Sequence, residues 1–299
     1  MKILITGSHG MVGSALAERL KAQGHEILCL VRHKANASRG EAYWNAEGGS
    51  VDKTGVDVLA PEAVISLAGE NIASGRWTQE RKRRIRDSRV NGTRALSEAL
   101  AHLQVKPKVF LCASAVGYFG SRGDEKLTEA SPPGHGFLAE VCQEWEAATK
   151  TSAEAGIRTA NLRFGVILSR SGGMLKKILL PFKLGVGGII GSGRQYMSWI
   201  TLEDVVGAIE FALQNSSLQG PVNTVAPEAV TNREFTKALG RKLWRPTCLP
   251  LPASTARMVF GEMADEMLLA SARVVPEKLE KAGFRFKHPD LKGALKSLL

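Results

Sequence analysis

The stretch that decides the fold is the first one, MKILITGSHGMVGSALAERLKAQGHEILCLVRHK (1–34). A short apolar run (2–6) leads into three glycines, and a helical spacing of apolar residues then continues to Gly24, a natural helix C-cap. A second apolar run (26–31) follows. Short runs that are nearly continuous in apolar residues are typical of strands buried on both faces of a parallel sheet. The stretch therefore predicts a strand, a tight turn, a helix and a second strand.

The same alternation continues along the first two thirds of the chain. Further apolar runs stand at 63–68, 108–114, 158–164 and 221–226, and a long helical pattern covers 78–103. Strands that alternate with helices predict an α/β fold with a doubly wound parallel sheet and right-handed crossovers, as in Rossmann domains.

The last third differs in composition. From about residue 166 the chain is rich in glycine, and we expect loops and short helices of a smaller substrate lobe, with core packing for Leu179, Leu180, Phe182 and Leu184. Three prolines in 245–254 mark a boundary. The predicted domains are 1–230, which binds the dinucleotide, and a small C-terminal domain over 246–295.

The three glycines have the spacing of a dinucleotide-binding turn. Gly7 would make the tight turn, Gly10 would let the backbone approach a pyrophosphate, and Gly13 would let the helix pack closely on the sheet. We assign to the cofactor Gly7, Ser8, Gly10, Met11, Val12 and Gly13. The alternative is an ordinary turn between a strand and a helix, but the flanking strand and helix favour the cofactor.

The residue after the second strand predicts which dinucleotide binds. NAD sites usually carry an acidic residue there, whereas this chain has Arg32, followed by His33 and Lys34. A guanidinium can hold a 2′-phosphate through a forked, charge-assisted contact. The sequence therefore predicts NADP(H) as cofactor; the alternative is that these are surface charges on a loop.

Composition excludes several classes of protein. In 299 residues, no apolar run approaches the roughly 20 residues of a membrane span, and the N-terminus does not resemble a signal peptide. We expect a cytoplasmic protein without a membrane partner. The six histidines lack metal-ligand spacing and the four cysteines lack a CxxC pair, so we expect no metal and buried, reduced thiols.

A net charge of +11 suits anionic partners. The basic run 76–89 could be a nucleic-acid surface, but no aromatic residues are interleaved in the manner of a known nucleic-acid module. A solvated helix face with one or two arginines turned to a cofactor phosphate is the simpler interpretation. We expect a small-molecule substrate, no nucleic-acid partner, and a chain compatible with a homo-oligomer.

Several motifs in order carry a family resemblance: TGSHGMVG (6–13), SLAGENI (66–72), SRVNGT (88–93), ASAVGYFG (113–120) and GSGRQYMSWITLEDV (191–205). With these the chain resembles the extended short-chain dehydrogenase/reductases, and in particular their atypical epimerase-family branch, NADP-dependent oxidoreductases with an added small C-terminal domain. The resemblance covers nearly the whole chain.

The resemblance implies roles for further residues. Leu67, Ala68 and Gly69 match the backbone along the adenosine and ribose side of the cofactor. Arg89 falls on a helix that passes the cofactor, where it would contact a phosphate. Ser114 matches the serine that hydrogen-bonds a substrate oxygen at the cofactor site, and Tyr118 is a candidate for a chemical role.

Two departures from the family pattern bear on activity. The family's Tyr and Lys, four residues apart on one helix, fall on Leu138 and Cys142, or on Phe137 and Val141 in the neighbouring register. Met197 stands where nucleotide-sugar enzymes of the family have an arginine. The open hypotheses are an NADP(H)-dependent oxidoreductase whose proton moves through Ser114, water or another group, a non-catalytic NADP(H) binder that controls a protein partner, and a nucleic-acid binder.

Overall fold

The computed structural model describes residues 1–299, except for the side chain of Ala37. Its centre is an eight-stranded sheet in the order β12, β8, β6, β5, β1, β2, β3, β4, parallel throughout except for the pair β3 and β4. The strands are β1 Lys2–Thr6, β2 Glu26–Val31, β3 Glu41–Asn45, β4 Ser50–Val51, β5 Ala63–Ser66, β6 Val109–Ala115, β8 Arg158–Phe164 and β12 Gly220–Thr224. The predicted doubly wound α/β sheet is confirmed.

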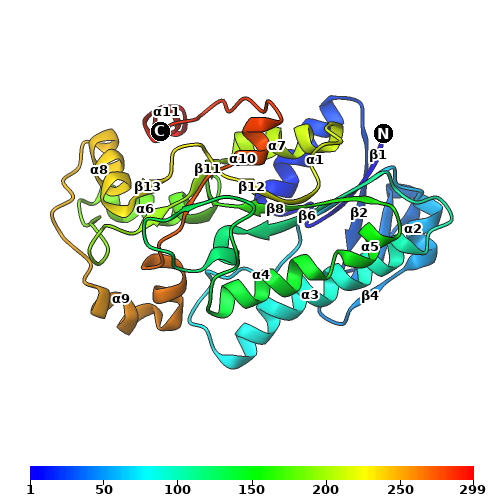
Figure 1. Cartoon of the computed structure of the whole chain (residues 1–299), viewed down its shortest axis with the longest axis horizontal. Helices are drawn as coiled ribbons and strands as arrows, with labels where there is room; N and C mark the ends of the chain where they lie inside the picture. Colours follow the sequence, from blue (N-terminus) through cyan, green and yellow to red (C-terminus); the bar gives the residue numbers. More distant parts are fainter.

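Helices cover both faces of this sheet (Figure 1). One layer holds α1 Met11–Ala22, α7 Leu202–Gln214 and α10 Glu277–Lys281, whose Leu16, Val205 and Leu279 share one apolar core. The other layer holds α2 Lys53–Leu59, α3 Gln79–Ala101, α4 Phe137–Ala147 and α5 Lys150–Glu154 over a second core. Thr78 caps α3 by accepting a hydrogen bond from the Arg81 amide, so the helix begins where the sequence predicts.

Small strand pairs and helices extend the carboxyl end of the sheet. The pairs are β7 Lys126–Leu127 with β14 Arg273–Val274, β9 Val166–Leu168 with β11 Trp199–Thr201, and β10 Tyr196–Met197 with β13 Val230–Thr231. The helices are α6 Gly173–Lys183, α8 Asn232–Leu243, α9 Ala253–Phe260 and α11 Leu291–Leu298, with single turns at Ala37–Arg39, Val116–Phe119 and Ala264–Leu268. A third apolar core joins α6, α8 and α11.

The C-terminal segment is joined to the rest of the chain by a shared core, a strand pair and hydrogen bonds. Leu279 belongs to the core above the sheet, and β14 pairs with β7. The buried carboxylate of Asp204, at the start of α7, accepts hydrogen bonds from the amides of Lys287 and His288 at 2.7 and 3.1 Å. The division into domains 1–230 and 246–295 remains a prediction.

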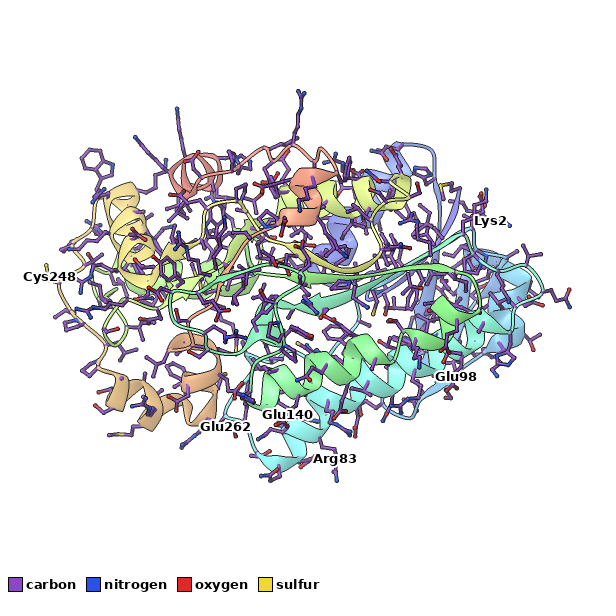
Figure 2. All side chains as sticks on the ribbon, in the orientation of Figure 1. Lys2, Arg83, Glu98, Glu140, Cys248 and Glu262 are labelled. Carbon is purple, nitrogen blue, oxygen red and sulfur yellow. The ribbon has the colours of Figure 1, made fainter. Side chains whose placement is uncertain are left out.

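Three details differ from what the sequence predicts. The strand expected over 63–68 ends at Ser66, because the chain turns there toward the carboxyl edge of the sheet. Leu180 and Leu184 are 64% and 69% exposed on α6, since the partners of that helix cover its other side, with Leu175 and Phe182. Cys248 is exposed at the end of the molecule opposite Lys2, in the proline-rich segment (Figure 2).

None of the described helices has the length and hydropathy to cross a bilayer.

Candidate functional site at the carboxyl edge of the sheet

The predicted site residues come from strands whose carboxyl ends meet at one edge. Thr6 of β1 pairs with Ser66 of β5 and with Leu30 of β2, and Ser114 of β6 pairs with Arg163 of β8. The strand order reverses between β1 and β5, which is the point where open α/β sheets bind ligands. Gly7, Arg32, Leu67 and Ser114 therefore lie along the same edge.

The turn after β1 leaves no room for a Cβ at Gly7 and Gly13 and little room for one at Gly10. Gly7 has φ of 70°, and a Cβ on it would stand 2.9 Å from the Ala68 nitrogen. A Cβ on Gly13 would stand 2.2 Å from the Gly7 carbonyl oxygen, and one on Gly10 3.2 Å from the same atom. Gly13 thus lets α1 pack closely against Gly7, which directly follows β1.

The start of α1 is open to an anion. No side chain caps its N-cap, Gly10, and no acidic residue stands in its first turn. Its first amides and the positive end of the helix dipole are therefore available to a phosphate. The Thr6 hydroxyl fixes the facing segment by accepting hydrogen bonds from the amides of Leu67 and Ala68, both at 3.1 Å.

Arg32 stands exposed directly after β2. Its neighbour His33 faces Glu41 at 3.8 Å, whereas no ion pair of the described side chains involves Arg32. A free guanidinium at this position suits a phosphate ligand. Its contact with the cofactor remains a prediction.

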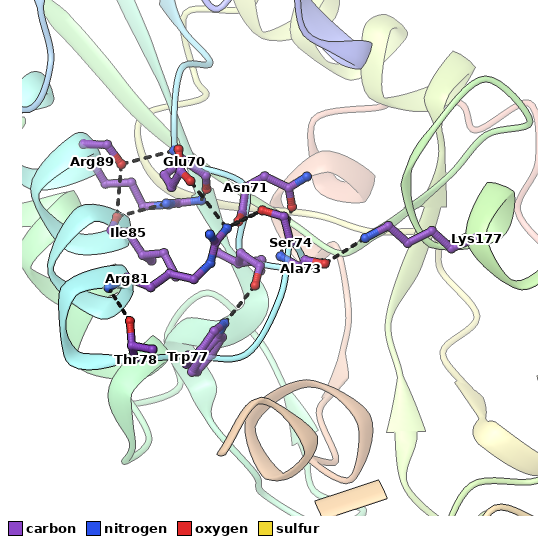
Figure 3. Close-up of polar contacts among 12 residues, drawn as sticks. Glu70, Asn71, Ala73, Ser74, Trp77, Thr78, Arg81, Ile85, Arg89 and Lys177 are labelled. Carbon is purple, nitrogen blue, oxygen red and sulfur yellow. Dashed lines mark hydrogen bonds and ion pairs between the residues drawn. The ribbon is translucent and has the colours of Figure 1, made fainter. Parts of the chain in front are cut away.

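Arginines of α3 hold the loop that follows β5 (Figure 3). Arg89 donates to the carbonyl oxygens of Ile85 and Glu70, both at 3.0 Å, and its guanidinium lies against Gly69. Arg81 donates to the Asn71 carbonyl oxygen at 2.6 Å. Burial lowers the pKa of Arg89, so the charge is poorly solvated and would favour a nearby anion.

Several basic side chains of the run 76–89 form ion pairs with carboxylates of the same chain. Arg81 pairs with Glu70, Lys82 with Glu262, and Arg86 with Glu144. Arg83 and Arg84 are exposed. Because these three side chains already pair with carboxylates of the chain, the geometry favours a solvated, ion-paired helix surface rather than a nucleic-acid surface.

Beneath the edge lies a buried polar cluster that joins three elements. Ser114 Oγ of β6 donates to Glu146 Oε1 of α4 at 2.7 Å. Arg163 of β8 donates to both oxygens of the same carboxylate, at 2.7 and 2.8 Å. Arg163 is 2% exposed, and its Nη1 has no hydrogen-bond partner among the described residues. A bidentate buried pair of this kind fixes the carboxylate in one orientation.

Tyr118 completes the cluster, because its ring lies under the guanidinium of Arg163 at 3.5 Å from the ring centroid. This cation–π contact positions both groups. The anionic partner of Arg163 is thus Glu146 of the same chain. The role of Glu146 was missed because the residue precedes Arg163 by seventeen positions on another element, with no local pattern linking them.

The α4 helix presents apolar atoms to the edge. Leu138 and Cys142 both face Gly117, where a Cβ would stand 3.3 Å from the Leu138 Cβ and 3.8 Å from the Cys142 sulfur. Burial raises the pKa of the Cys142 thiol to about 12, and the adjacent Glu146 carboxylate also raises it. Burial is the larger of the two causes, and a raised pKa keeps the thiol protonated and poorly nucleophilic at neutral pH.

Two large cavities lie away from the glycine turn and from Ser114. One of about 720 Å³ is lined by residues that include Lys126, Glu228 and Arg273, and one of about 640 Å³ by residues that include Arg194 and Arg233. Neither is lined by the glycine turn or by Ser114. We place the candidate site at the strand ends because the glycine turn, Arg32 and Ser114 come together there. The described side chains also form no group of three or more metal-ligating residues.

Comparison with known proteins places the chain in a family. The family model described as "NAD dependent epimerase/dehydratase family" matches residues 3–225. This chain belongs to that family. A second model, described as a domain of unknown function (DUF1731), matches residues 251–298.

Relatives of this epimerase-family chain match over its full length. An epimerase family protein of Mycobacterium bovis is 45% identical over 98% of this chain and 96% of its own length. The epimerase family protein YfhF of Bacillus subtilis is 35% identical over 100% of this chain and 98% of its own length.

Solved structures confirm the extended short-chain dehydrogenase/reductase fold of the epimerase-family chain. The human epimerase family protein SDR39U1, solved with NADPH, matches with a TM-score of 0.89 and 32% identity over 100% of this chain and 99% of its own. A UDP-glucose 4-epimerase of Thermus thermophilus, solved with NAD, matches with a TM-score of 0.74. That structure is 21% identical over 100% of this chain and 97% of its own, so it supports the fold alone.

Proposed function

We propose that this chain binds NADP(H) and is an oxidoreductase that acts on a small-molecule substrate. The observation that carries the proposal is the turn after β1, where three glycines leave space, α1 begins uncapped, and Arg32 stands free beside it. The human relative solved with NADPH supports the choice of dinucleotide. A cytoplasmic location belongs to the same proposal.

The residues at the sheet edge have distinct binding roles. The backbone of 7–13 and the first turn of α1 would hold the pyrophosphate, and Arg32 would hold the 2′-phosphate. Leu67, Ala68 and Gly69 would line the adenosine side, with Arg89 close behind them. The bound dinucleotide would supply a hydride donor or acceptor.

In this proposal the buried cluster around Ser114 and Glu146 transfers the proton. Ser114 Oγ donates a hydrogen bond to Glu146 Oε1, so it can take a proton from a substrate hydroxyl while it passes its own proton to the carboxylate. In the reverse direction, Glu146 returns the proton through Ser114 to a substrate oxygen. Arg163 and Tyr118 position this pair, and no tyrosine and lysine at 138 and 142 are needed for it.

The experiment combines binding and turnover. NADPH should bind the purified protein in calorimetry, and a panel of carbonyl compounds should identify one that consumes NADPH. Ser114→Ala should then lower kcat by about 10²–10⁴-fold and leave NADPH affinity within about twofold, because it removes the relay and not the phosphate site. Ser114→Thr keeps a hydroxyl and is the matched control. Unchanged turnover in Ser114→Ala would refute the relay.

A second function is favoured by the apolar face of α4. Leu138 and Cys142 offer no acid or base at the positions where the resemblance places the family's Tyr and Lys. A non-catalytic NADP(H) binder that controls a protein partner fits that observation. Tight NADPH binding together with no NADPH consumption across a broad carbonyl panel would select it.

A further inference from the structure

Two segments of the chain carry basic residues and no acidic ones. Residues 170–202 contain five basic residues and no acidic one, and residues 235–261 again contain five basic and no acidic residues. These ten charges compare with a net charge of +11 for the whole chain. The cofactor site accounts for none of them, because Arg32 and Arg89 lie outside both segments.

The same two segments expose large apolar side chains. Leu180, Leu184, Val186 and Leu249 are between 55% and 69% exposed, and Trp244 is 90% exposed. Trp244 sits at the C-cap of α8 with φ of 55°, a conformation that glycine adopts most readily. A tryptophan held in solvent at such a position contributes little to folding.

Hydrogen bonds join the two segments at one end of the molecule. Arg245 Nε donates to the Lys183 carbonyl oxygen at 2.7 Å, and the Leu251 amide donates to the Ile189 carbonyl oxygen at 2.8 Å. Figure 1 shows α6 and α8 at this end, and Figure 2 places Cys248 at its tip. We call this surface the Trp244 face; it consists of Leu180, Lys183, Leu184, Val186, Arg241, Lys242, Trp244, Arg245 and Leu249.

The cations of the Trp244 face are not neutralised by the protein. The ion pairs among the described side chains include none of its four basic residues. On α3, by contrast, Arg81, Lys82 and Arg86 all pair with carboxylates. The face is therefore both cationic and apolar, with no carboxylate in either segment to repel an anion.

We propose that the Trp244 face docks this protein on an anionic lipid surface. A tryptophan inserts its apolar body at the boundary between headgroups and acyl chains, and lysine and arginine stems extend over the apolar layer while their charged ends reach lipid phosphates. Negative headgroups complement the unpaired cations. Docking of this kind needs no spanning helix, so it amends the expectation that the chain has no membrane partner.

The experiment measures sedimentation of the full chain with vesicles. The protein should sediment with vesicles of equal parts phosphatidylcholine and phosphatidylglycerol, and at least tenfold less with phosphatidylcholine alone. Salt of about 0.5 M should release it, because the attraction is screened. Tryptophan emission should shift to the blue on binding, since Trp44, Trp145 and Trp199 are already buried and Trp244 is the most exposed.

Substitutions on the Trp244 face test whether this surface contacts the vesicles. Trp244→Gly suits the backbone at φ of 55° and should abolish the blue shift and weaken binding at least tenfold. The double variant Arg241→Glu with Lys242→Glu should weaken binding at least as much. Its matched control is Arg83→Glu with Arg84→Glu, the same charge change at exposed positions of α3, where Figure 2 places Arg83 far from Cys248. Unchanged far-ultraviolet circular dichroism and thermal melting verify folding.

Three results would overturn the proposal. The first is an absence of binding to anionic vesicles, and the second is an equal loss in both charge-reversal variants, which would indicate diffuse attraction. The third is a dimer in sedimentation velocity that Trp244→Gly dissociates, because the face would then bind a second copy of the chain. NADPH binding is measured separately, so failure here leaves the proposed function untouched.

Discussion

At the residue scale, the single side chain of Arg32 is expected to set cofactor preference. Arg32→Asp should weaken NADPH binding by about 10²-fold, because it removes a charge-assisted contact worth about 1.5–3 kcal/mol and adds repulsion. NADH lacks the 2′-phosphate, so its affinity should hold or rise. Calorimetry with both dinucleotides measures the ratio, and an unchanged preference would contradict the assignment.

Glu146 offers a second test at this scale, on stability. Glu146→Ala leaves Arg163, which is 2% exposed, as an uncompensated buried charge, so the free energy of unfolding should fall by about 3–5 kcal/mol. Glu144→Ala on the same helix is the control. Its partner Arg86 is 48% exposed, so that variant should lose at most about 1 kcal/mol. Urea unfolding compares the two, and equal losses would show that the buried pair carries no special stability.

At the scale of the element, helix α1 needs glycine where it meets the turn. Alanine usually stabilises a helix interior by about 0.5–1 kcal/mol over glycine. In Gly13→Ala the new Cβ would stand 2.2 Å from the Gly7 carbonyl oxygen, so overpacking prevails and about 1–3 kcal/mol of stability should be lost, together with NADPH affinity.

Gly207→Ala in α7 is the matched case for that prediction. There the new Cβ meets Phe284 at 3.6 Å, an ordinary contact, so the helix should gain stability and NADPH binding should not change. Thermal unfolding and calorimetry of both variants give the comparison. A stabilised Gly13→Ala that binds NADPH normally would be incompatible with the turn geometry described above.

At the scale of the whole molecule, the C-terminal segment should unfold together with the sheet domain. Leu279 lies in the main core, β14 pairs with β7, and amides of 287 and 288 satisfy the buried Asp204. Scanning calorimetry should therefore show one transition with equal calorimetric and van't Hoff enthalpies. Two separated transitions would instead support independent domains divided near residue 246.

The sequence by itself determined the strand, glycine turn and helix at the N-terminus. The requirements of such a turn are local: a positive φ at Gly7, no Cβ at Gly13, and an uncapped helix start. Nearly continuous apolar runs likewise predicted the central strands, because burial on both faces leaves little choice of residue. The short strand β3 escaped notice because exposed Tyr43 and Asn45 alternate with its buried Ala42 and Trp44, and β4 escaped because it has only two residues.

Only the tertiary structure decided the rest of the site. Ser114, Glu146 and Arg163 come from β6, α4 and β8, and they meet because parallel strands align at their carboxyl ends under a crossing helix. The exposure of Leu180, Leu184 and Trp244 could not be predicted either, because the sequence does not show whether another part of the chain covers an apolar residue. Pairing and burial are long-range outcomes of packing, whereas turn geometry is fixed by neighbouring residues.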